Sequence, residues 1–147
     1  SEPLHKIHNV SVLVYHLVCS AKYRRAVVTP AVDTVIRDVC LAMADRYEIR
    51  FLEIGTDRDH VHFLVQSVPM YSPTKIARVI KSLTAREVFQ RVPSVKKQLW
   101  GGEFWSDGYS ISTVGHHGTE AQIRDYVANQ GRTNEYKQLH VEQLSLV

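Results

Sequence analysis

Residues 48–68 read EIRFLEIGTDRDHVHFLVQSV. Two runs rich in β-branched and aromatic residues, Glu48 to Thr56 and Val61 to Val68, flank a short polar stretch. This pattern is typical of two strands joined by a hairpin, with Thr56-Asp57-Arg58-Asp59 as the connection. We therefore predict an antiparallel strand pair over this part of the chain.

The hairpin is flanked by two segments with helical periodicity. From Pro30 to Tyr47 the apolar residues are spaced by three and four, which indicates an amphipathic helix with Pro30 in its first turn. A second helix is predicted to follow Ser72, an N-cap residue, and to run to about Arg91. On this second helix the apolar positions fall on one arc and several basic residues fall roughly opposite.

Two more extended stretches complete the pattern, Asn9 to Ala21 before the first helix and Tyr109 to Val114 after the second. The order of elements is then βαββαβ. This order predicts an α+β domain of the ferredoxin-like kind, with an antiparallel sheet and helices on one face. We expect residues 1–147 to form this single domain.

The C-terminal part is predicted to add a short helix. Thr119 is a suitable N-cap, Gln122 completes a capping box, and Gly131 ends the helix, which gives a helix over about residues 119–131. The tail from Thr133 to Val147 is expected to carry a further short helix.

Composition excludes some classes of protein. No run of about 18 apolar residues is present, so no membrane span is expected. The two cysteines, Cys19 and Cys40, are too few for a disulfide framework and favour a reducing, cytoplasmic setting.

Basic residues are unevenly distributed. Between Pro69 and Gly102 seven basic residues accompany one acidic residue, Glu87, and a second cluster reads Lys22-Tyr23-Arg24-Arg25. Positive charge beside aromatic rings suits a nucleic-acid backbone. A solvated helix face is the alternative explanation.

His60-Val61-His62 is the first candidate for chemistry. Side chains on a strand alternate between faces, so both imidazoles point to one side and Val61 to the other. Two neutral imidazoles at this spacing can bind one metal ion. The alternative is that both histidines are partly buried and hydrogen-bonded to the backbone. A structural zinc site is a further alternative, but the sequence shows no third and fourth ligand at suitable spacing.

Tyr126 and Gln130 are the second candidate. They stand four residues apart and therefore project from one face of the predicted C-terminal helix. A glutamine oxygen can complete a neutral metal shell with His60 and His62, and a phenol can attack phosphorus. Alternatively, Tyr126 is a packing residue.

These residues together suit phosphodiester chemistry. A divalent metal would stabilise charge on the phosphoryl oxygens while Tyr126 attacks. The phosphotyrosine ester preserves the energy of the broken bond, so rejoining needs no nucleotide cofactor. In keeping with this, no Gly-x-x-x-x-Gly-Lys loop is present.

Several different short motifs follow one another in a specific order along nearly the whole chain. They are YHLV (15–18), KYRR (22–25), DHVHFLV (59–65), YSP (71–73), LWGGEFWSDGY (99–109), TVG (113–115) and YVANQ (126–130). With these segments the sequence resembles the small single-tyrosine transposases of the HUH superfamily, the IS200/IS605 type that moves as single strands. His60 and His62 match the histidine ligands of that family, Tyr126 its nucleophile and Gln130 its third ligand.

The resemblance implies a mechanism and partners. Such enzymes use magnesium or manganese, recognise single-stranded DNA hairpins near the element ends, and leave a 5′-phosphotyrosine and a free 3′-hydroxyl. They are homodimers whose active sites can combine the histidines of one chain with the tyrosine of the other. Candidates for contacts to the hairpin phosphates are Lys22, Arg24, Arg25, Arg78 and Lys81.

Two other functions are compatible with the same sequence. One is a domesticated endonuclease of this superfamily that acts on chromosomal palindromes. The other is a non-catalytic module that binds single-stranded DNA hairpins, in which Tyr126 stacks on a base or packs in the core.

Overall fold

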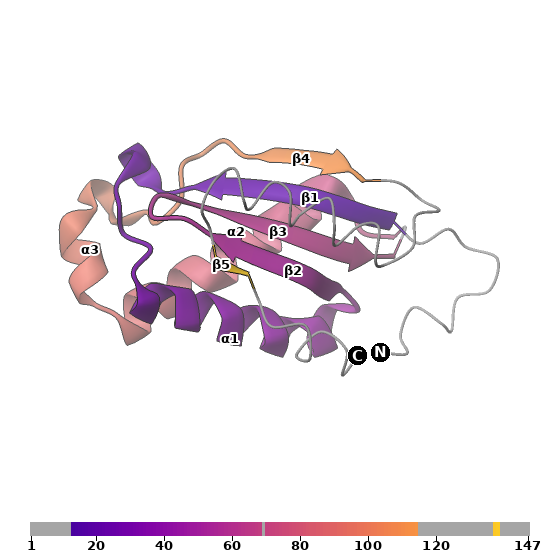
Figure 1. The fold of residues 1–147 in the computed structure, drawn as a ribbon, viewed down its shortest axis with the longest axis horizontal. Coiled ribbons are helices and arrows are strands. Elements are labelled where there is room, and N and C mark those ends of the chain that lie inside the picture. The colour runs from indigo at the N-terminus through magenta and orange to yellow at the C-terminus, as the bar shows by residue number, and fades with distance from the viewer. Residues whose placement is uncertain (1–12, 69, 115–136, 139–147) are drawn as a thin grey trace.

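An antiparallel sheet forms the centre of the protein (Figure 1). The structure is a computed structural model, and it describes residues 13–68, 70–114 and 137–138. Its strands lie in the order β4-β1-β3-β2-β5, and every pairing is antiparallel. The strands are β1 (Leu13–Ser20), β2 (Arg50–Thr56), β3 (His60–Ser67), β4 (Ser110–Thr113) and β5 (Lys137–Gln138).

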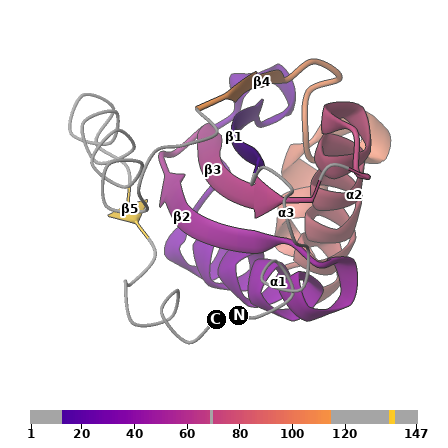
Figure 2. The ribbon, with the colours of Figure 1, turned by 90° about the vertical axis from the view of Figure 1, so that its right-hand side faces the viewer.

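Two long helices cover one face of this sheet (Figure 2). They are α1 (Pro30–Tyr47) and α2 (Pro73–Arg91). Each begins with proline behind a hydroxyl cap: Thr29 Oγ1 accepts from the Val32 amide at 3.3 Å, and Ser72 Oγ accepts from the Lys75 amide at 3.0 Å. The predicted ferredoxin-like α+β fold is therefore confirmed, with α1 and α2 on the same face of the sheet.

Short elements account for the differences from the predicted fold. The segment after Pro93 forms a brief helix, α3 (Ser94–Gln98), and single 3₁₀ turns occupy Lys22–Arg24 and Trp100–Gly102. α3 packs Val95 into the core, and five residues are too few to show a helical period.

The helix expected in the C-terminal tail is wrong at Lys137 and Gln138, which instead pair with Thr56 and Gly55 as strand β5. The edge of β2 carries backbone N–H and C=O groups that can pair with a further strand. The sequence around Lys137 and Gln138 does not show that these residues pair there. The predicted helix over about residues 119–131 lies outside the described residues.

The core lies between the sheet and the two helices. Alternation along β1 and β3 directs Leu17 and Phe63 toward the helices, where both are fully buried with Ile36 and Ile80. The other face carries a smaller apolar cluster of Val14, Leu52 and Leu64, against which Val114 packs. Two chemically different sheet faces result, and the second one carries the histidines.

Both cysteines lie in the core as free thiols, as expected from their number. Burial raises the pKa of the Cys19 thiol to about 12. No helix within residues 13–68, 70–114 and 137–138 has the length and apolar character needed to cross a membrane.

A buried threonine joins α2 to the segment that follows it. Thr84 Oγ1 donates to the Ile80 carbonyl at 2.6 Å and accepts from Trp105 Nε1 at 2.9 Å. We expect Thr84→Val to lower the free energy of unfolding by about 1–3 kcal/mol, because the buried indole N–H loses its acceptor. Urea denaturation followed by circular dichroism measures this loss.

Thr34 provides the matched control. Its hydroxyl also donates to the carbonyl four residues earlier, Pro30, at 3.0 Å, but it is exposed and on α1. Thr34→Val is expected to change stability by less than about 0.5 kcal/mol. Equal losses in the two variants would show that the Trp105 contact contributes nothing.

Candidate metal and DNA-cleavage site

The paired histidines lie on β3, on the sheet face opposite the helices. Val61 between them is fully buried toward the helix layer. The His60 side chain is 14% exposed, and His62 is 6% exposed. Their ring centroids lie 5.1 Å apart at an interplanar angle of 64°. Strand alternation therefore brings the two imidazoles together as the sequence predicts.

Asp59, the last residue of the β2–β3 turn, contacts the first histidine. Its Oδ1 lies 2.8 Å from Nδ1 of His60. Its Oδ2 accepts from Nε of Arg24 at 3.3 Å. Because the carboxylate engages Nδ1, metal coordination by His60 would use Nε2.

His16 contacts the second histidine from β1. His16 pairs with Leu64 and His62 with Val18, so the two histidines are diagonal neighbours across the β1–β3 ladder. Nε2 of His16 lies 2.9 Å from Nδ1 of His62. The rings are stacked, with centroids 5.1 Å apart and an interplanar angle of 24°. On the other side of His62, Gly55 of β2 adds no side chain.

The surroundings favour neutral imidazoles at His62 and His16 and an ionised carboxylate at Asp59. Burial lowers the pKa of His62 to about 4, and repulsion from His16 and His60 adds to this effect. Burial also lowers the pKa of His16. The hydrogen bond from His60, followed by the charge of Arg24, holds the pKa of Asp59 below its usual range. At neutral pH His62 and His16 are thus in the neutral form, the form in which imidazole binds metal.

Two of the three predicted metal ligands, His60 and His62, lie in the described part of the chain. Their chemistry suits a divalent ion. His60 and His62 present ring nitrogens from one strand face, and each has its Nδ1 oriented by a hydrogen bond. Within the described ranges, no group of three His, Cys, Asp or Glu side chains could hold a metal ion. Tyr126 and Gln130, the predicted nucleophile and third ligand, lie outside these ranges and stay predictions.

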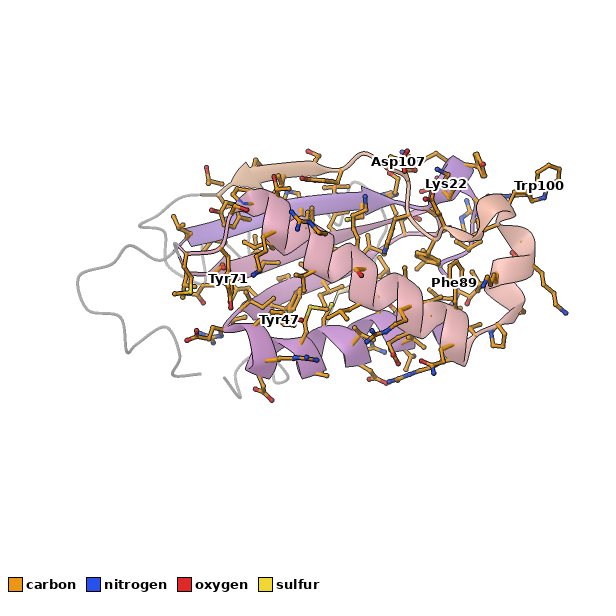
Figure 3. The ribbon with its side chains drawn as sticks, turned by 180° about the vertical axis from the view of Figure 1, so that it is seen from behind. Lys22, Tyr47, Tyr71, Phe89, Trp100 and Asp107 are labelled. Atoms are coloured by element: carbon orange, nitrogen blue, oxygen red, sulfur yellow. The ribbon has the colours of Figure 1, made fainter. Side chains whose placement is uncertain are left out.

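The predicted phosphate contacts fall into two groups. Lys22 pairs with Glu103 at 2.9 Å and with Asp107 at 3.7 Å, and Figure 3 shows Lys22 and Asp107 at the same end of the molecule. The Glu103 hydrogen bond is the main cause that raises the pKa of Lys22. Lys81 Nζ donates to the carbonyls of Ser106 and Asp107 at 2.8 and 3.0 Å. These two lysines therefore hold the 103–107 segment in place.

The three arginines of the set are more accessible. Arg24 is 63% exposed in its side chain although it contacts Asp59, and Arg25 and Arg78 are exposed. Their contacts to phosphates stay predictions.

Sequence reasoning assigned no role to Asp59 or His16, which the structure places against the two candidate ligands. Asp59 could have been found from its position directly before His60. His16 could have been found only with the β1–β3 register, since it lies 46 residues from His62 along the chain.

The fold and site define an α+β domain with a paired-histidine motif on a ferredoxin-like sheet, on the face away from α1 and α2. Residues 9–130 match the family described as IS200-like transposases. The chain belongs to this family, whose members are enzymes that cut and rejoin DNA.

Individual relatives agree with this assignment. The chain is 32% identical over 118 residues to the ISDra2 transposase TnpA of Deinococcus radiodurans, an alignment that covers 80% of this chain and 84% of the relative. It is 29% identical over 120 residues to the transposase for insertion sequence element IS200 of Salmonella typhimurium, with coverage of 79% and 75%.

Solved structures show the same fold. A crystal structure of a Deinococcus radiodurans protein assigned as a transposase superposes with a TM-score of 0.68 at 31% identity, over 84% of this chain and 95% of the other. A REP-associated tyrosine transposase bound to a REP hairpin gives a TM-score of 0.59 over 86% and 71%. At 10% identity this second likeness shows the fold alone.

Proposed function

We propose that this chain cleaves and rejoins single-stranded DNA at hairpin-bearing transposon ends, with Tyr126 as nucleophile and a divalent metal held by His60, His62 and Gln130. One observation carries the proposal. In a member of the IS200-like family, the side chains of His60 and His62 lie on one strand face, and Nδ1 of each ring contacts a neighbouring side chain.

The chemistry follows from the residue types. The phenolic oxygen of Tyr126 attacks the phosphorus and forms a new P–O bond, while the bond from phosphorus to the 3′-oxygen breaks. The phenol proton is lost, and the leaving 3′-oxygen takes up a proton to become a hydroxyl. A bound Mg²⁺ or Mn²⁺ would withdraw charge from the phosphoryl oxygens during this exchange.

Rejoining is the same exchange in reverse. A 3′-hydroxyl attacks the 5′-phosphotyrosine, the P–O bond to Tyr126 breaks, and the phenol recovers its proton. The number of phosphodiester bonds is conserved, so no nucleotide cofactor takes part. We further propose that the chain acts as a homodimer, in which Tyr126 of one copy can serve the histidines of the other.

Element ends supply the direct test. Oligonucleotides that carry the sequences flanking this gene, as single strands and as duplexes, are incubated with the protein and Mg²⁺ or Mn²⁺. We expect a protein–DNA adduct stable to denaturing electrophoresis with single strands that can form hairpins, and none with duplexes. Adduct formation on duplexes alone would contradict the proposal.

The accessible arginines are expected to supply phosphate contacts. Arg25→Ala and Arg78→Ala should each weaken hairpin binding and reduce the slope of log affinity against log salt by about 1, since each removes one phosphate contact. Fluorescence anisotropy at several salt concentrations measures both quantities.

Arg46, an exposed arginine in the last turn of α1, is a matched control outside the predicted set. Arg46→Ala is expected to leave affinity and slope unchanged. Equal slopes for wild type, Arg25→Ala and Arg78→Ala would remove these residues from the proposed DNA interface.

The rival functions predict different results. A non-catalytic hairpin-binding module would bind the same oligonucleotides without forming an adduct. A domesticated endonuclease would form the adduct on chromosomal palindromes and not on the sequences beside its own gene.

A further inference from the structure

Two side chains outside the predicted ligand set contact the rings of His60 and His62. Asp59 Oδ1 lies 2.8 Å from Nδ1 of His60, and His16 Nε2 lies 2.9 Å from Nδ1 of His62. Both contacts fall on Nδ1, so both bear on whether Nε2 of each ring keeps its lone pair. They do so in chemically different ways, because one partner is a carboxylate and the other an imidazole.

We propose that Asp59 and His16 are positioning residues that select the metal-binding tautomers of His60 and His62. This inference rests on the proposed function, since it takes the two histidines of β3 as metal ligands.

Asp59 allows His60 one tautomer. An ionised carboxylate only accepts hydrogen bonds, so a 2.8 Å contact requires the proton on Nδ1 of His60. When a metal ion takes Nε2, the one proton left on the ring is the Nδ1 proton that Asp59 accepts. Arg24 donates to the second oxygen of Asp59 at 3.3 Å and holds the carboxylate in this orientation. The result is a carboxylate–histidine pair of the type that orients metal ligands.

His16 allows His62 two tautomers, and only one of them binds metal. When the proton lies on Nδ1 of His62, this nitrogen donates to Nε2 of His16, and Nε2 of His62 keeps its lone pair. In the reverse arrangement His16 donates, and the proton on Nε2 of His62 blocks coordination. His16 thus serves the metal-bound state as a buried acceptor, and its stacked ring restricts rotation of His62.

Metal affinity tests the two roles separately. Mn²⁺ binding to the chain of residues 1–147 is measured by titration calorimetry. We expect Asp59→Ala and His16→Phe each to weaken Mn²⁺ affinity by about 10–100-fold, the usual effect of removing a partner of a metal ligand. His16→Gln is expected to stay within about 3-fold of wild type, because the amide oxygen can accept from Nδ1 of His62.

Controls separate this role from general stability. His16→Leu is a second variant without an acceptor, should His16→Phe fail to fold. Asp38 is an exposed carboxylate of α1, 3.7 Å from Arg91, and Asp38→Ala is expected to leave Mn²⁺ affinity unchanged. Any substitution of His16 would disturb the packing around it. Mn²⁺ affinity that is retained in His16→Gln but lost in His16→Phe therefore shows that the missing hydrogen-bond acceptor causes the loss.

Ring ¹⁵N chemical shifts provide a readout that needs no metal. In the metal-free chain we expect His60 with the proton on Nδ1 and an unprotonated Nε2. In Asp59→Ala we expect a mixture of both tautomers. A wild-type His60 with its proton on Nε2 would overturn the role of Asp59.

The outcomes distinguish this inference from the proposed function. If the wild-type chain does not bind Mn²⁺, or binds it equally well after His60→Ala, the proposed metal site is wrong and the inference falls with it. If binding requires both His60 and His62 but is unaffected by Asp59→Ala and by the His16 variants, the metal site stands and the positioning roles are overturned.

Discussion

The Tyr126→Phe variant is expected to bind hairpin DNA as tightly as wild type while forming no covalent adduct. The substitution removes only the phenolic oxygen, which is the atom proposed to bond to phosphorus. Without it no phosphotyrosine can form, and we expect cleavage to fall by at least about a thousand-fold, as is usual when a nucleophile is removed. Denaturing electrophoresis of labelled single strands measures cleavage and adduct, and anisotropy measures binding.

Tyr47 offers a control for this variant. It is a half-buried tyrosine in the last turn of α1, outside the predicted site and the basic clusters. Tyr47→Phe is expected to keep both cleavage and adduct formation. Cleavage by Tyr126→Phe at the wild-type rate would show that another group attacks the DNA.

Loss of either histidine of β3 should have the second largest effect. We expect His60→Ala and His62→Ala to lower metal-dependent cleavage by at least about a hundred-fold, because each removes one of three proposed ligands and the ion supplies several kcal/mol of charge stabilisation. A chelator should abolish wild-type cleavage, and added Mn²⁺ should restore it. Initial rates over a range of Mn²⁺ concentrations measure the effect.

His140→Ala provides the comparison, since His140 lies outside residues 9–130 that match the family. It is expected to cleave as wild type does. Wild-type cleavage that persists in excess chelator would rule out the proposed metal, whatever the histidine variants do.

The long helices show what the sequence could predict. Both α1 and α2 span the predicted residues, because a proline behind a hydroxyl cap marks each start and apolar spacing marks each length. That the side chains of His60 and His62 lie on the same face of the strand was equally predictable, since alternation of side chains along a strand is a local property.

Long-range contacts could not be predicted in this way. The stacking of His16 on His62 depends on the register between β1 and β3, which no local pattern contains. Strand β5 forms because β2 has an open edge, although its own two residues carry no strand pattern. Lys81 was expected on the basic, outward-facing side of α2. Instead it donates to the carbonyls of Ser106 and Asp107, which lie 25 and 26 residues further along the chain.

Peptide mapping of the DNA adduct tests the central claim most directly. After reaction with a single-stranded element end, the protein is digested with trypsin and the DNA-linked peptide is identified by mass spectrometry. The claim predicts that the DNA is attached through its 5′-phosphate to the peptide Asp125–Arg132, in which Tyr126 is the single tyrosine. DNA linked to any other residue, or cleavage that proceeds with no linked peptide, would contradict it.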